Sequence, residues 1–180
     1  MKFIRNILTA LTVLTFVFCL NLEAHAQKRR TATKRTTTAA KNTATAPANA
    51  AEIKASAGKV SSQIKNVTRF IYLLGGIARG IEDIDKEAKT RKISQTALNL
   101  NDTNKKNVIQ SLKNLRAGLA ALEAEFRTKP ALRLYNFHIQ GISDMGGQAE
   151  DLAMTGQFTE SGKMLISIVE KLSDTLVSLP

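Results

Sequence analysis

The feature that most constrains the fold is an apolar repeat with helical spacing that continues from residue 52 to residue 180. In its first segment, residues 52–91, apolar side chains recur at alternating steps of four and three, the spacing of a heptad seam. No run of period-two alternation typical of strands interrupts the pattern. The first stripe consists of Ile53, Ala57, Val60, Ile64, Val67, Ile71, Leu74, Ala78 and Ile81. The sequence therefore predicts an all-α domain over residues 52–180.

Three further segments carry the same pattern, over residues 101–128, 131–155 and from 159 onward. Pro130 separates the first two of these because proline ends one helix and suits the first turn of the next. Gly156 is predicted to close the segment that it follows. The inward positions are predicted to be Val108, Ile109, Leu112, Leu115, Leu119, Leu122, Phe126, Leu132, Tyr135, Ile139, Ile142, Met145, Ala149, Leu152, Leu165, Ile168, Val169, Leu172, Leu176 and Leu179.

Four amphipathic helices with short connections favour an up-down-up-down four-helix bundle. A three-helix core from which the first helix projects is the alternative. Residues 92–101 are predicted to be a polar connector, with Asn101, Asp102 or Thr103 as the N-cap of the second helix. Thr159 is the predicted N-cap of the fourth.

Acid-to-base pairs four residues apart stabilise the exposed face of a helix. The end of the first predicted helix offers three of them, in the favourable order. They are Glu82–Lys86, Asp85–Lys89 and Glu87–Arg91. The sequence therefore predicts that this face is exposed to solvent.

The first 26 residues are typical of a secretory signal peptide. Lys2 and Arg5 provide a positive start, residues 7–22 form an apolar run, and Ala24-His25-Ala26 matches the pattern that signal peptidase cleaves. A retained membrane anchor is the alternative, but the apolar run is shorter than the ~20 residues that span a bilayer. We therefore expect an extracytoplasmic protein, periplasmic or secreted, with no transmembrane span after cleavage.

Residues 27–51 consist of Ala, Thr, Lys, Arg, Asn and Gln with a single Pro. This composition cannot bury enough surface to offset the entropy of ordering, so it predicts a disordered basic linker. Its six cations, with no acidic residue among them, are Lys28, Arg29, Arg30, Lys34, Arg35 and Lys41. They predict contact with an anionic cell-envelope polymer or lipid surface. A solvated spacer is the alternative.

Nucleic acid is disfavoured as a partner of this basic linker. The signal peptide directs the chain away from the compartment that holds DNA. The linker also lacks aromatic side chains that could stack on bases.

The residue types of the chain exclude most catalytic chemistry. After signal cleavage no cysteine remains and His138 is the only histidine, which excludes disulfides, thiol nucleophiles and multi-histidine metal sites. The match of Ser62–Lys65 to S-x-x-K lacks the accompanying K-T-G of serine enzymes that recognise penicillin. We therefore expect a non-enzymatic protein without catalytic residues, cofactor or bound metal.

The strongest candidate for an interface is the sequence from Phe70 to Ile77, which reads FIYLLGGI. Consecutive large apolar residues surround a helix completely, so Phe70, Tyr72, Leu73 and Ile77 are predicted to point away from the seam. An uncovered apolar patch marks a surface for a protein partner or a second copy of the chain. The alternative is that the first helix is central and these residues belong to the core.

Glycines inside predicted helices are a second unusual feature, because each costs about 1 kcal/mol relative to alanine. They are Gly75, Gly76, Gly80, Gly141, Gly146 and Gly147. They predict kinks, close helix contacts or a glycine-lined groove. The leading hypothesis is thus an exported helical-bundle protein with an envelope-associated binding or structural role. The alternative hypothesis is a small-ligand carrier that uses a glycine-lined bundle interior.

Overall fold

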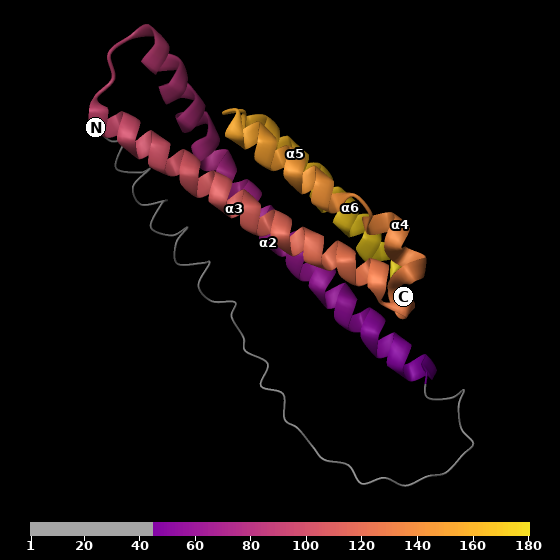
Figure 1. Ribbon diagram of the computed structural model, residues 1–180. Coiled ribbons are helices and arrows are strands. Elements are labelled where there is room, and N and C mark those ends of the chain that lie inside the picture. The colour runs from indigo at the N-terminus through magenta and orange to yellow at the C-terminus, as the bar shows by residue number, and fades with distance from the viewer. Residues whose placement is uncertain (1–44) are drawn as a thin grey trace, which may run out of the picture. The chain divides into compact units, whose positions relative to one another are not determined.

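The computed structural model describes residues 45–180, which are helical apart from short turns and contain no strand. The prediction of an all-α fold is confirmed for these residues. The elements are α2 (Thr45–Thr90), α3 (Gln95–Thr128), the 3₁₀ helix η2 (Pro130–Tyr135), α4 (Asn136–Ile139), α5 (Ile142–Met154) and α6 (Phe158–Ser178) (Figure 1). The predicted signal peptide and residues 27–44 of the predicted linker lie outside the described residues.

Helix α2 begins at Thr45, seven residues before the predicted start at Glu52. Residues 45–51 lack large apolar side chains, so the sequence pattern places them in the linker. They are nevertheless rich in alanine, the strongest helix former, and Pro47 falls in the first turn, where a missing N–H costs no hydrogen bond. Helix propensity therefore extends the helix beyond its apolar stripe.

The connection between α2 and α3 is shorter than predicted, because α3 already begins at Gln95. Ser94 is its N-cap, and the Ser94 side chain accepts a hydrogen bond from the backbone N–H of Ala97 at 3.3 Å. Asn101 is not an N-cap but a buried residue inside α3. Its side-chain amide donates to Asp85 Oδ1 of α2 at 2.8 Å, so it holds the two helices together near their turn.

The third predicted helix is divided into η2, α4 and α5. The break lies at Gly141, whose φ of 88° is in the left-handed region that glycine adopts without strain. Gly156 closes α5 as predicted, with a φ of 81° and its N–H donating to Ala153 O at 3.0 Å. The next N–H, of Gln157, donates to Leu152 O at 2.8 Å, which completes a Schellman motif.

The core is built from the predicted stripes. Every inward position named from the sequence in the four segments is buried or half-buried. The largest fully buried side chains are Phe126, Phe158, Leu74, Ile81, Leu112, Leu119, Leu132, Ile139, Ile142, Leu165, Ile168 and Leu172. Helical periodicity therefore identifies most of the core, but Phe70, Ala153 and Phe158 are buried core residues outside the predicted stripes.

Helices α2 and α3 form one hairpin and α5 and α6 form another, which lies along α3 (Figure 1). α5 packs against both α3 and α6. The buried hydroxyl of Ser161 on α6 donates to Ala149 O of α5 at 2.7 Å. α2 is held by longer side chains, among them Leu74, which lies 3.6 Å from the Cβ position of Gly162 on α6.

Candidate functional surfaces

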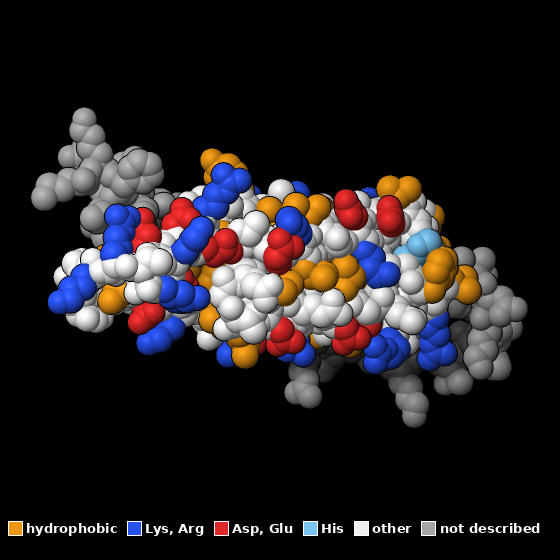
Figure 2. Space-filling model, turned by 90° about the horizontal axis from the view of Figure 1, so that it is seen from above, with side chains coloured by type: hydrophobic (Ala, Val, Ile, Leu, Met, Phe, Trp, Pro, Cys, Tyr) orange, Lys and Arg blue, Asp and Glu red, His pale blue; other side chains and the backbone are white. Residues whose placement is uncertain are grey.

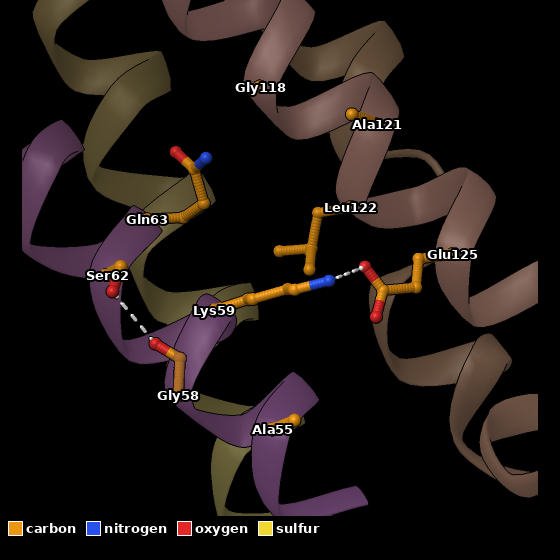
Figure 3. A pocket seen from close by; sticks show the side chains of 9 residues that line it. All are labelled: Ala55, Gly58, Lys59, Ser62, Gln63, Gly118, Ala121, Leu122 and Glu125. Carbon is orange, nitrogen blue, oxygen red and sulfur yellow. Dashed lines mark hydrogen bonds and ion pairs between the residues drawn. The ribbon is translucent and has the colours of Figure 1, made fainter. Parts of the chain in front are cut away.

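A groove of about 400 Å³ lies between the first half of α2 and the second half of α3 (Figure 3). It is lined by Ala55, Gly58, Lys59, Ser62, Gln63, Gly118, Ala121, Leu122 and Glu125. The groove exists because most of these side chains are small. At Gly118 a Cβ atom would lie 2.8 Å from Nε2 of Gln63, so the side chain of Gln63 occupies the space that a larger residue would fill.

Glu125 is the central charge of this groove. Its carboxylate accepts hydrogen bonds from Lys59 Nζ at 2.6 Å, Lys129 Nζ at 2.6 Å and Ser56 Oγ at 3.0 Å. Burial alone raises the pKa of Glu125. The hydrogen bonds from Lys129, Lys59 and Ser56 outweigh this effect and lower the pKa from 4.5 to about 2. The hydrogen bond to Glu125 in turn raises the pKa of Lys129, which also lies 3.5 Å from Glu52.

This arrangement joins two helices and does not prepare them for proton transfer. A general acid or base works best with a pKa near the operating pH, far above the pKa of Glu125. Ser62 donates its hydroxyl to the carbonyl of Gly58 at 2.9 Å, as helical serines often do. The Ser62 hydroxyl is therefore bonded to the backbone of its own helix.

Two other carboxylates from the α2–α3 hairpin cap helices that lie elsewhere in the chain. Glu123 of α3 accepts from the backbone N–H of Gly141 at 2.9 Å and of Ser143 at 3.1 Å, at the start of α5. Glu82 of α2 accepts from the N–H of Thr159 at 2.7 Å and from its hydroxyl at 3.0 Å, at the start of α6. The prediction of Thr159 as N-cap is wrong, because α6 begins at Phe158 with Gln157 at the N-cap position, and Thr159 lies in the first turn, where Glu82 accepts from it.

These tertiary contacts change the predicted pattern of surface charge pairs. Of the three pairs predicted along α2, only Glu87–Arg91 forms. Asp85 pairs with Lys105 of α3 at 2.6 Å, and Glu82 is used at α6. The end of α2 therefore makes more tertiary contacts than its sequence suggests.

The predicted interface residues of α2 do not share one environment. Phe70 is only 6% exposed and packs in the core, so the prediction that it points away from the core is wrong. Tyr72 is 83% exposed. Leu73 and Ile77 are half-buried, with Ile77 against the core. The six cations of the predicted basic linker, from Lys28 to Lys41, lie outside the described residues.

The helical glycines fall into two groups. Gly75, Gly76 and Gly80 of α2 have no atom within 4 Å of the position that a Cβ would take. By contrast, the backbone of α5 is in close contact with α3 at Gly146, where a Cβ would lie 3.3 Å from Leu119 Cδ1 and 3.4 Å from Arg116 Cβ. Side chains of α3 therefore fill the space beside Gly146, where the ligand-carrier hypothesis requires an open cavity.

We expect Gly146→Ala to destabilise the domain by about 1 kcal/mol or more, because overpacking a close contact outweighs the gain in helix propensity. The same change at Gly58, which has no atom within 4 Å of its Cβ position, should stabilise the domain by about 0.5–1 kcal/mol. Chemical denaturation of both variants measures whether the free energy of unfolding falls in the first and rises in the second. Equal stabilisation of both variants would contradict the close contact.

Sequence reasoning missed an apolar patch where α3 is connected to α5. Leu134 is 81% exposed and Phe137 67% exposed, and the ring of Phe137 lies 3.8 Å from that of His138. In Figure 2 the pale blue of histidine lies beside the orange of apolar side chains. The signal was present, because both residues fall between the inward positions Leu132, Tyr135 and Ile139. His138 is half-buried and is a neighbour of this patch.

Within residues 45–180 no cluster of three or more His, Asp or Glu side chains has an arrangement that could hold a metal ion. None of the helices of that region is both long enough and apolar enough to cross a bilayer. No protein-family model, curated protein or solved structure matches this chain.

Proposed function

We propose that this protein is exported and binds an anionic surface of the cell envelope through the cations of residues 27–51. The helical domain is the folded body that this segment attaches, and the role is one of binding or structure, without catalysis.

The observation that carries this proposal is the distribution of charge along the chain. Residues 27–51 contain six basic residues and no acidic one, whereas residues 52–180 contain 18 basic and 14 acidic residues. Several of those acidic side chains are engaged within the described domain, as at Glu82, Glu123 and Glu125. Each cation near an anionic membrane contributes about 1 kcal/mol of attraction, so six of them are sufficient for stable binding.

We further propose that the helical segments alternate in direction as an up-down-up-down bundle. In this arrangement α2, α3 and α6 are the first, second and fourth members, and η2, α4 and α5 together are the third. The packing of α5 on both α3 and α6 supports this topology, as does the contact of Glu82 with Thr159.

Co-sedimentation with isolated cell envelopes tests the proposed function. The protein beginning at residue 27 is compared with a variant of equal length in which all six cations are replaced by glutamine. We expect the unmodified protein to pellet at low salt and to be released at high salt, because exposed charges are screened within ~10 Å at 0.1 M salt. The variant should bind at least about a hundredfold more weakly.

Two outcomes contradict this function. Equal pelleting of both proteins would assign binding to the helical domain, and pelleting of neither would exclude the envelope as the partner. Vesicles of anionic and of zwitterionic lipid, run beside the envelopes, distinguish lipid from polymer. Binding to envelopes but not to anionic vesicles identifies the polymer.

A further inference from the structure

One face of α2 has no partner among residues 45–180. Seven residues on this face stand at Gly76 and at 4, 7 and 11 positions to either side of it. With 3.6 residues per turn, all of them lie within about 40° of Gly76 around the helix axis, along roughly 33 Å. They are Lys65, Arg69, Tyr72, Gly76, Gly80, Asp83 and Glu87. All are exposed or half-exposed.

The charges on this face are complementary to those of a second, antiparallel copy of the same face. The half before Gly76 carries Lys65 and Arg69, and the half after it carries Asp83 and Glu87. Neither Arg69 nor Asp83 forms an ion pair with any residue of the described unit. A second copy of this face, antiparallel to the first with Gly76 at the crossing, places Arg69 opposite Asp83 twice. Lys65 falls opposite Glu87, which also pairs with Arg91 within the chain.

The uncharged residues of this face also fit an antiparallel second copy that crosses at Gly76. Gly76 falls opposite itself, so two helix backbones can approach closely where neither has a side chain. Tyr72 is 83% exposed and falls opposite Gly80, which has no atom within 4 Å of its Cβ position and therefore leaves room for the ring. These glycines cost helix stability and make no close contact within the described unit. Contact with a second copy gives them a packing role.

We infer that two copies of this chain associate through this face of α2, antiparallel and related by a two-fold axis at Gly76. Two-fold symmetry is the commonest form of protein self-association, and it requires a self-complementary surface. This inference goes beyond the proposed function and does not depend on the cations of residues 27–51.

Charge reversal tests the pairing of Arg69 with Asp83. In an Arg69→Asp homodimer, or in an Asp83→Arg homodimer, like charges face each other at both ends. We expect each to raise the dimer dissociation constant on the order of tenfold or more at low ionic strength. The double variant Arg69→Asp/Asp83→Arg should recover the association of the unmodified protein. An equimolar mixture of the two single variants should form a heterodimer, because every pair is again opposite in charge.

Sedimentation equilibrium of the full chain and its variants measures these states. The inference is overturned if the unmodified protein stays monomeric up to high micromolar concentration, if the single reversals dimerise like the unmodified protein, or if their mixture does not associate. Circular dichroism of each variant checks that it is folded. These substitutions are exposed on α2, so a loss of folding is not expected to accompany a loss of dimer.

A glycine variant tests the close approach separately. Gly76→Leu should abolish the dimer while it leaves the monomer folded, because no atom lies within 4 Å of the Cβ position within the chain. Gly58→Leu is the matched control, an exposed helical glycine of α2 that lies about 27 Å along the helix axis from Gly76, beyond the seven residues of this face, and it should dimerise like the unmodified protein. Persistence of the dimer in Gly76→Leu would overturn the crossing at Gly76.

Discussion

Replacing Glu123 with alanine is expected to lower the free energy of unfolding by about 3 kcal/mol, one of the largest effects of any polar substitution in this domain. Glu123 is only 6% exposed, and its two carboxylate oxygens accept from the N–H groups of Gly141 and Ser143. Those N–H groups belong to the first turn of α5, where a helix has no internal acceptors and a negative charge is favourable. Alanine leaves these two donors without their acceptor in a partly buried site.

Urea denaturation of Glu123→Ala beside Glu170→Ala provides the measurement. Glu170 is an exposed residue of α6, and its replacement should change stability by less than about 0.5 kcal/mol. Hydrogen exchange gives a local readout, since the amides of Gly141 and Ser143 should lose protection more than those in the middle of α3. A loss below about 1 kcal/mol, or unchanged exchange at these two amides, would contradict the capping role.

The capping role of Glu123 also shows which features of this fold can be predicted from the sequence and which cannot. Apolar periodicity predicted the all-α fold and the inward positions because burial repeats with the turn of the helix, which is a local property. Glu123 and Glu82 could not be recognised as caps. Each accepts from a backbone that is 18 or more residues away, so their partners are set by helix packing. Helix spacing instead predicted a pair between Glu82 and Lys86.

The exposure of the candidate interface residues could be predicted only in part, for a similar reason. A run of consecutive large side chains must place some of them away from any single seam, and Tyr72 is exposed as expected. The sequence could not decide how wide the buried stripe is, and α2 buries Phe70 as well as Leu74 and Val67. The alternation of Leu134 and Phe137 with inward residues was readable, but the short η2 and α4 elements that expose them were predicted as a continuous helix.

The stability contributed by Glu125 is expected to depend on pH. Its pKa is about 2 in the folded protein and near 4.5 when unperturbed. A lowered pKa means that the folded state prefers the ionised carboxylate, so its contribution is full above about pH 4.5 and is lost as the pH falls towards 2. With allowance for the partly exposed lysines, this contribution amounts to about 2–3 kcal/mol at neutral pH and to less than half of that at pH 3.

Glu125→Gln isolates this contribution, since glutamine cannot ionise but keeps nearly the same size. At pH 7 we expect the variant to be about 2–3 kcal/mol less stable than the unmodified protein, and we expect the difference to shrink as the pH falls to 3. Denaturation curves of both proteins at each pH give the difference directly, so the protonation of other carboxylates cancels. A difference that stays constant from pH 7 to pH 3 would show that the network of Lys59, Lys129 and Ser56 does not hold an ionised Glu125.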